Sequence, residues 1–354
     1  MGKPLVFVSV QYRLNIFAFG DGVGSKNLAL QDQALALHWI QDHISGFGGD
    51  PERVTLAGES AGAVYCHAHL VTGAPARQYI LSSGSLHLSP PQPKEKASAL
   101  RQSVQAQFDG LELRTVSVAA MVEAVKRSKI QSWFLEEDLR FKNWQNTTGS
   151  AQGLLISDVQ NEAVLWREGI MSTDTEAIVS AFDLAGESST ELKRLYSIDS
   201  GRPSSSKLGA LDFINDYKFV LPAEKLVEQW RAEQKPVFRC IIDEANPWQP
   251  SNGAHHAVDL ILLFGGFDLS LAPKAQQTGA NMRKQWIEFV HEEEPWSQNV
   301  HTAFGPHGVF QELDDDELRS RRRMAQVEFL GRTDGAILDK VFFALAAGKL
   351  SLLN

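Results

Sequence analysis

The chain has 354 residues, 43% of them hydrophobic, so it is long enough to fold around one large core. Its formal net charge of −9 and pI near 5.6 argue against nucleic acid or an anionic membrane as a partner, because both attract a basic face. No apolar stretch approaches the ~20 residues that cross a bilayer, and the N-terminus lacks the pattern of a secretory signal. We therefore expect a single domain over residues 1–354, soluble and cytoplasmic.

The chain has only two cysteines, Cys66 and Cys240. Two thiols can form neither the disulfide framework of a small secreted scaffold nor a four-cysteine metal site, so we expect both to be free and buried. His67 and His69 stand two residues apart on a predicted helix and therefore point to different faces. We predict no metal site and no cofactor.

The predicted elements alternate between strand and helix. Residues 5–10 form a nearly continuous β-branched and aromatic run, as in an interior strand of a parallel sheet. Apolar residues from Leu30 to Ile44, spaced by four and three, then predict a helix that ends at Gly46. Further strands are predicted at residues 54–57, 78–82, 154–156 and 237–242. This alternation predicts an α/β fold with a mostly parallel sheet.

Two long segments, at about residues 86–150 and 163–234, interrupt the alternation with helical patterns. We interpret both as insertions that cover the carboxyl edge of the sheet, where open α/β folds build their sites. Plain solvent-facing helices are the alternative. Near the C-terminus, acidic residues 314–317 precede Arg319 and the arginines 321–323. This order predicts a solvated helix whose charges complement its dipole.

The segment Gly58-Glu59-Ser60-Ala61-Gly62 lies between a predicted strand and a predicted helix. A serine hydroxyl is a weak nucleophile, so it must be exposed on a sharp turn where a base takes its proton and amides face the oxyanion. Flanking glycines permit that turn, and the strand-to-helix context is what the motif requires. Ser60 is therefore the candidate nucleophile, against the alternative of a glycine-containing helix start.

The residues around Ser60 resemble the type-B carboxylesterase and cholinesterase family, especially its fungal members. The similarity is carried by the segments 47–51 (Phe-Gly-Gly-Asp-Pro) and 54–62, with 10–13, 27–33, 81–84, 156–162 and 253–265. The resemblance covers most of the chain and implies the α/β-hydrolase fold and a serine ester hydrolase acting on a small-molecule ester.

The same resemblance assigns the general base to His256, because the family's histidine lies nine residues before the glycine of a Phe-Gly pair, here Gly265. His255 would only shape the turn. For the acid, the loop after the strand at 154–156 matches the family at Glu162, which would hold the imidazole tautomer and stabilise the imidazolium. Asp243 is the rival acid, after what we expect to be the last strand. The chain departs from the family's loop at Ser157, Asn161 and Ala163.

The family's oxyanion hole combines the amide after the nucleophile, here Ala61, with amides of a His-Gly-Gly segment that this sequence lacks. Residues 46–49 are no substitute, because they match the family's turn before the serine strand. The resemblance also implies an absent N-terminal region, so that the five predicted strands match the family's fourth to eighth and two strand edges lack partners. We expect either an incomplete gene model or a truncated paralogue, with turnover lowered by ~10²–10³ through the missing donor.

Two functions follow as hypotheses. The first is hydrolysis of a carboxylic ester through an acyl-serine intermediate, by Ser60, Glu162 and His256 with the Ala61 amide. The second is a non-catalytic homologue that binds a ligand or protein, which the missing oxyanion segment favours. The sequence leaves the identity of the ester and the oligomeric state open.

Overall fold

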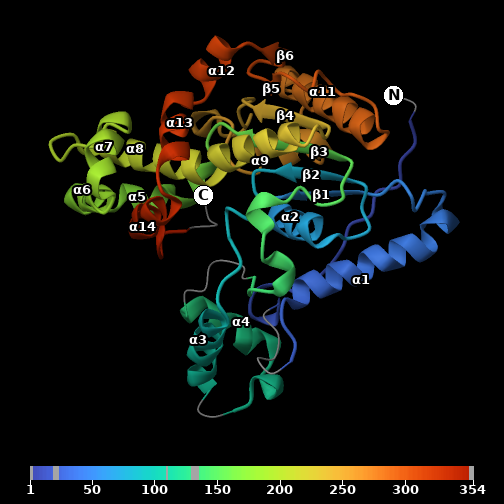
Figure 1. The fold of residues 1–354 in the computed structure, drawn as a ribbon, viewed down its shortest axis with the longest axis horizontal. Coiled ribbons are helices and arrows are strands. Elements are labelled where there is room, and N and C mark those ends of the chain that lie inside the picture. Colours follow the sequence, from blue (N-terminus) through green and yellow to red (C-terminus); the bar gives the residue numbers. More distant parts are fainter. Residues whose placement is uncertain (1–2, 19–23, 109–110, 129–134, 351–354) are drawn as a thin grey trace.

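A computed structural model describes residues 3–18, 24–108, 111–128 and 135–350 of the chain. Within them, six strands form one sheet in the order β1-β2-β3-β4-β5-β6 (Figure 1). Neighbours from β1 to β5 are parallel, and β6 is antiparallel to β5. The strands are β1 (Thr55–Glu59), β2 (Gln78–Ser82), β3 (Gly153–Val159), β4 (Val237–Ile242), β5 (His301–Phe304) and β6 (Phe310–Leu313).

The predicted α/β architecture is confirmed, and four of its five predicted strands become β1 to β4. The expectation that β4 is the last strand is wrong, because β5 and β6 follow it. Each of these two strands has only four residues, and β6 carries polar side chains at its centre. Such short segments give little periodic signal in the sequence.

The prediction of an interior strand at residues 5–10 is also wrong. The segment is extended but pairs with no strand among the described residues, and Phe7 is 66% exposed. An interior strand needs hydrogen-bonded neighbours on both edges, whereas this segment runs beside the body of the molecule (Figure 1). The Phe7 ring instead meets the ring of Phe264, with centroids 5.6 Å apart.

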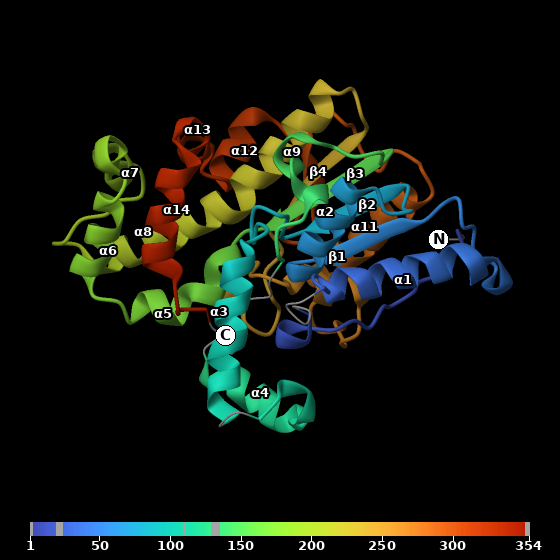
Figure 2. The ribbon, with the colours of Figure 1, turned by 60° about the horizontal axis from the view of Figure 1, so that its bottom comes forward.

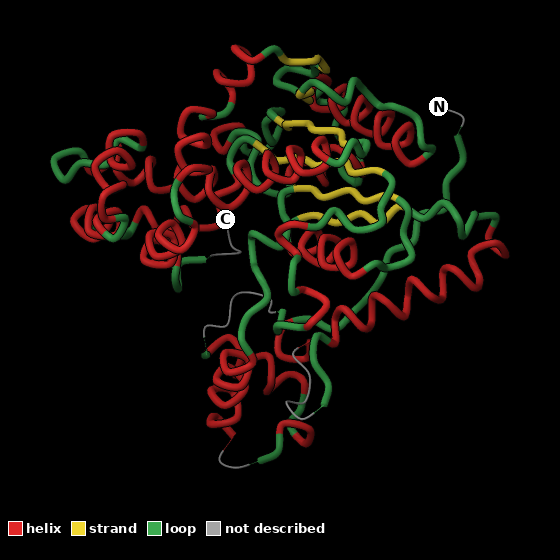
Figure 3. The backbone as a smooth tube through the Cα atoms, in the orientation of Figure 1, coloured by secondary structure: helices red, strands yellow, loops and turns green. Residues whose placement is uncertain are grey.

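Helices cover both faces of the sheet (Figure 3). None of those in the described part of the chain is long and apolar enough to span a membrane. The helices are α1 (Leu28–His43), α2 (Ala61–Thr72), α3 (Lys94–Gln105), α4 (Val118–Arg127), α5 (Arg167–Met171), α6 (Thr175–Asp183), α7 (Ser189–Leu195), α8 (Pro203–Asn215), α9 (Leu221–Ala232), α10 (Val258–Phe264), α11 (Pro273–Val290), α12 (Asp315–Arg321), α13 (Met324–Arg332) and α14 (Gly335–Ala346).

Strand β3 contributes side chains to the apolar clusters on both faces of the sheet, because successive residues of a strand point to opposite faces. Leu155 and Val159 pack in one cluster with residues of α10 and α11. Leu154 and Ile156 pack in another with residues of α2 and α9. Every residue of β3 is buried, as expected for a central parallel strand with helices on both faces.

The two predicted insertions form separate helical groups. Helices α5 to α8, with α13 and α14, share a large apolar cluster of their own. Helices α3 and α4 pack on each other and on Ile16, and project from the body of the molecule (Figures 1 and 2). The helix predicted to end at Gly46 is confirmed as α1, followed by a 3₁₀ turn at Ile44–Phe47. Cys66 and Cys240 are free and buried, as predicted.

Candidate active site

Ser60 occupies a strained turn between β1 and α2. Its backbone has φ 55° and ψ −119°, a conformation that costs a non-glycine residue about 1–3 kcal/mol and is concentrated at functional sites. The Ser60 N–H donates to the carbonyl of Ser82 at the end of β2, at 2.9 Å, which fixes the turn to the sheet. A Cβ on Gly58 would lie 2.3 Å from the carbonyl carbon of Gly62. Glycine at position 58 therefore lets the strand and helix approach closely enough to form the turn.

His256 reaches Ser60 from the loop before α10. Its Nε2 lies 2.8 Å from Ser60 Oγ. The His256 backbone N–H donates to the carbonyl of Asn161, at 3.3 Å, and the Asn161 N–H donates to the carbonyl of Ala254, at 2.9 Å. This short bridge joins the loop of His256 to the loop after β3, so the two predicted site segments are held side by side. His255 makes separate contacts, its Nε2 lying 2.9 Å from Asn246 Nδ2.

Glu162 meets the other imidazole nitrogen. Its Oε2 lies 2.5 Å from His256 Nδ1, and its side chain has no exposed surface. The second oxygen, Oε1, accepts the backbone N–H of Val159 at 2.8 Å. The Glu162 N–H in turn donates to the Asn215 side chain at 2.8 Å. Both carboxylate oxygens are therefore satisfied, and the carboxylate is fixed in one orientation toward the imidazole.

The rival acid, Asp243, lies elsewhere. Its carboxylate accepts from Arg322 at 2.8 Å and from Arg321 at 3.5 Å, and no hydrogen bond joins it to His256 in the described structure. Its neighbour Glu244 accepts from Thr278 Oγ1 at 3.0 Å and from the Gly308 N–H at 2.8 Å. The geometry thus brings Ser60, His256 and Glu162 together and leaves Asp243 in a structural role.

Arg321 to Arg323 correct the prediction of a solvated basic helix end. The acidic start of α12 is a capping box on Asp314, and Arg319 pairs with Glu328 at the surface. The three following arginines pair with buried carboxylates, and the guanidinium of Arg322, only 2% exposed, bonds to both Asp158 and Asp243. Their partners lie far away in the sequence, so local charge order does not predict them.

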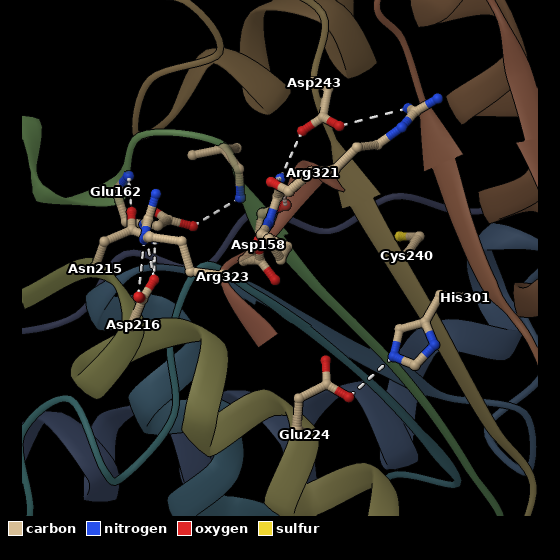
Figure 4. A network of polar contacts seen from close by, with 12 residues as sticks. Asp158, Glu162, Asn215, Asp216, Glu224, Cys240, Asp243, His301, Arg321 and Arg323 are labelled. Atoms are coloured by element: carbon tan, nitrogen blue, oxygen red, sulfur yellow. Dashed lines mark hydrogen bonds and ion pairs between the residues drawn. The ribbon is translucent and has the colours of Figure 1, made fainter. Parts of the chain in front are cut away.

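The ion pairs of Arg322 belong to a larger network of ion pairs, which extends to the residues next to Glu162. Arg239 of β4 pairs with Asp158 of β3, both buried, and with the half-buried Glu224 of α9. Arg323 makes two bonds to the buried Asp216, next to the Asn215 that supports Glu162 (Figure 4). The network therefore links β3, β4 and α12 behind the loop that carries the carboxylate.

Two further carboxylates surround His256. Glu59 Oε1 lies 3.2 Å from His256 Nε2, and burial raises the pKa of Glu59 to about 8. Burial also raises the pKa of Asp259, with help from the charge of Glu162, to about 6. Neither residue was predicted, although Glu59 lies inside the serine motif and Asp259 follows His256 by three. Their buried oxygens Glu59 Oε1 and Asp259 Oδ1 accept no hydrogen bond in the described structure.

The acidic surroundings make His256 more basic. Burial alone would lower the pKa of His256, but the hydrogen bond and charge of Glu162, with Glu59 and Asp259, outweigh it and raise that pKa to about 9. A basic imidazole is a strong proton acceptor for a hydroxyl. The Ala61 N–H, at the first residue of α2, has no acceptor within its own helix.

His67 and His69, for which no metal site was predicted, each hydrogen-bond to a different part of the chain. His67 Nδ1 accepts the Leu86 N–H at 3.1 Å, whereas His69 Nε2 lies 3.0 Å from Gln33 Oε1. Residues 46–49 lie in the turn before β1, as the family resemblance implied. Within the described residues, no group of three or more histidine, cysteine or acidic side chains has the geometry to hold a metal.

Comparisons with known proteins identify similar sequences and a similar fold. Residues 1–327 match a family described as "Carboxylesterase family". The chain is 29% identical to "Lipase 3" of Yarrowia lipolytica over 98% of its own length and 72% of the lipase. Over 91 aligned positions, which cover 24% of the chain and 16% of the relative, the chain is 45% identical to "Inactive carboxylesterase-like protein VdtD" of Byssochlamys spectabilis. The fold is similar to that of a solved "PNB ESTERASE", with a TM-score of 0.68, 22% identity and coverage of 88% of this chain and 72% of that one.

Proposed function

Because this chain belongs to the carboxylesterase family, we propose that it hydrolyses carboxylic esters through an acyl-enzyme intermediate on Ser60. The observation that carries the proposal is the hydrogen-bonded series from Ser60 Oγ through the His256 ring to Glu162. A nucleophile, its base and an orienting carboxylate in contact form the arrangement that activates a serine hydroxyl.

In the first half of the reaction, Ser60 Oγ attacks the ester carbonyl carbon while its proton passes to His256 Nε2. The carbonyl oxygen becomes an oxyanion, which the Ala61 N–H stabilises by hydrogen bonding. When the intermediate collapses, the C–O bond to the alcohol breaks, and the alcohol leaves with the proton from His256. Glu162 keeps the imidazolium in place through Nδ1.

In the second half, a water attacks the acyl-serine carbonyl and gives its proton to His256 Nε2. Collapse of this second intermediate breaks the Ser60 Oγ–acyl bond and returns the proton to Ser60. The products are the carboxylic acid and the regenerated serine. The same three side chains thus serve both halves, so no further protein group is required for proton transfer.

A short-chain nitrophenyl ester tests this proposal directly. We expect the purified chain to release nitrophenol and Ser60→Ala to release none above the buffer rate. Equal rates for the two proteins would end the proposal. Labelling with a fluorophosphonate adds a measurement that needs no turnover, because only an activated serine reacts. The mass increase should map to Ser60 and disappear in His256→Ala.

A binding protein without turnover is the second candidate. It is supported by the relative VdtD, which is named an inactive carboxylesterase-like protein and matches 24% of the chain. For such a protein, the fluorophosphonate would label Ser60 weakly or not at all, and the nitrophenyl ester would bind without being cleaved.

A further inference from the structure

Phe219 is a buried aromatic residue that packs against the candidate general base. It is 3% exposed and lies in the π-helical turn Asp216–Val220 between α8 and α9. Its ring meets the ring of His256 nearly edge-on, with centroids 5.7 Å apart and an interplanar angle of 67°. This geometry is one that aromatic pairs favour. Turns of this kind inside helices are frequent at functional sites.

The turn has a local cause in the sequence and is held on several sides. Pro222 follows it at the start of α9 and has no N–H to donate to the carbonyl four residues earlier, so the regular helical pattern is interrupted there. Both carboxylate oxygens of Asp216 accept from Arg323, at 2.7 and 2.9 Å. The ring of Phe219 also meets the ring of Trp166, with centroids 6.4 Å apart. Phe219 therefore presents a fixed surface to the imidazole.

The same part of the fold supports the candidate acid. Asn215, the residue before the turn, accepts the Glu162 N–H through its side chain at 2.8 Å. Trp166, on which Phe219 packs, ends the 3₁₀ turn Glu162–Trp166 that carries the carboxylate. The acid and the ring beside the base are thus held by one packed unit, which fixes the position of the imidazole relative to Glu162.

The hydrogen bonds of His256 change during the proposed reaction. In the free protein, Ser60 Oγ donates to Nε2, 2.8 Å away, and Glu162 accepts from Nδ1. Once Oγ is acylated it carries no hydrogen, and the neutral imidazole has none on Nε2, so these two atoms cannot bond. The ionised carboxylate of Glu59, 3.2 Å from Nε2, is also only an acceptor. In the acyl-enzyme, packing therefore keeps Nε2 in place for the incoming water.

We propose that Phe219 is a positioning residue for deacylation, whose ring keeps the neutral His256 imidazole directed toward the acyl carbon until a water enters. This inference rests on the proposed function. The water oxygen attacks the acyl carbon while its proton passes to Nε2, and a displaced base slows that step. Acylation depends less on Phe219, because the Ser60 hydroxyl is then bonded to the ring.

Pre-steady-state hydrolysis of a neutral nitrophenyl ester tests this difference between the two steps. Phe219→Leu removes the ring, so we expect deacylation to become the slow step and kcat to fall by about tenfold or more. Because kcat/KM reports only the steps up to the release of nitrophenol, kcat/KM should stay close to that of the wild type, and KM should fall with kcat. A burst of nitrophenol stoichiometric with the enzyme should precede the slow phase.

Phe213→Leu is the matched control. Phe213 is a buried ring of the same apolar cluster that packs on Phe182 and Tyr196, and no ring contact joins it to His256 in the described structure. The two leucine variants should unfold at similar urea concentrations, but Phe213→Leu should keep the kinetics of the wild type. Phe219→Met, which keeps a similar apolar volume without a ring, replaces Phe219→Leu if the latter does not fold.

Two kinetic results would overturn the inference and leave the proposed function intact. The first is an unchanged kcat in the Phe219 variant. The second is a parallel fall of kcat and kcat/KM without a burst, because acylation would then depend on the ring as much as deacylation does.

A measurement without turnover separates this inference from the proposed function. If the wild type releases no nitrophenol, the proposed function fails, but the packing can still be tested in Ser60→Ala, where His256 also lacks its serine partner. The His256 proton shared with Glu162 should give a sharp proton NMR signal in Ser60→Ala and in Ser60→Ala/Phe213→Leu. In Ser60→Ala/Phe219→Leu we expect this signal to broaden, because the loosened ring exchanges its proton with water. A sharp signal in all three proteins would overturn the inference.

Discussion

Glu59 Oε1 lies 3.2 Å from His256 Nε2, the same ring nitrogen that lies 2.8 Å from Ser60 Oγ. One nitrogen thus faces both the candidate nucleophile and a carboxylate from the adjacent residue. A negative charge at this position stabilises the imidazolium and weakens it as an acid. The residue between glycine and serine in the motif therefore helps to set the pH range in which the base is free.

The first prediction concerns that pH range. Only neutral His256 can accept the serine proton, so kcat/KM should rise with pH through a histidine pKa that lies above its ordinary value of 6.5. Replacing Glu59 by glutamine removes one anion and lowers this pKa, which moves the rising limb to lower pH. The measurement is the pH profile of kcat/KM on a neutral nitrophenyl ester. The exposed Glu52→Gln serves as control, and a limb that stays in place in Glu59→Gln contradicts the assignment.

The second prediction tests whether Glu162 or Asp243 is the acid that orients His256. In Glu162→Gln, the amide oxygen can still accept the Val159 N–H, but an NH₂ group then faces His256 Nδ1 and disfavours the required tautomer. We expect kcat to fall by about 10⁴, as when the acid of a serine protease is replaced by its amide. Asp243→Asn should lower kcat by less than about tenfold, because Asp243 contacts arginines. The reverse order of the two effects would make Asp243 the acid.

The sequence predicted which residues of the candidate site lie together better than it predicted the strands of the sheet. Ser60 was placed by its flanking glycines and its strand-to-helix context, which are local features. His256 and Glu162 were placed by spacing within a family pattern, and the structure brings both to Ser60. The prediction of a strand at residues 5–10 was wrong because it rested on apolar composition. That composition indicates that a segment can be buried, whereas a strand also needs hydrogen-bonded neighbours. None of the described residues offers one.

The parts of the site that sequence did not predict depend on contacts between distant residues. Arg322 bonds to Asp158, 164 positions away, and Asn215 bonds to Glu162, 53 positions away. Pairings of this kind carry no local periodicity, so they come from the structure alone.

The third prediction tests the turn at Ser60 by stability. Gly58→Ala puts a Cβ against the backbone of Gly62, where no side chain can move aside, and should destabilise the fold by about 1–3 kcal/mol or more. Gly62→Ala meets nothing within 4 Å and replaces a helical glycine, so it should stabilise by up to about 1 kcal/mol. Urea unfolding of the three proteins measures both changes. Equal stability of the two variants would show that the close approach at Gly58 is absent.

The fourth prediction concerns the network behind Glu162. Arg322→Met keeps most of the buried volume but deprives Asp158 and Asp243 of a shared cation. Breaking a buried pair from one side costs about 3–5 kcal/mol, because the remaining charge stays buried, and Arg239 offsets part of that here. We expect the free energy of unfolding to fall by an amount near the lower end of this range. The loss is measured as a shift of the urea midpoint with an unchanged dependence of the unfolding free energy on urea concentration. Arg319→Met, whose exposed pair with Glu328 is worth at most about 1 kcal/mol, is the matched control. Similar small losses in both variants would mean that Arg322 is solvated, as its sequence context first indicated.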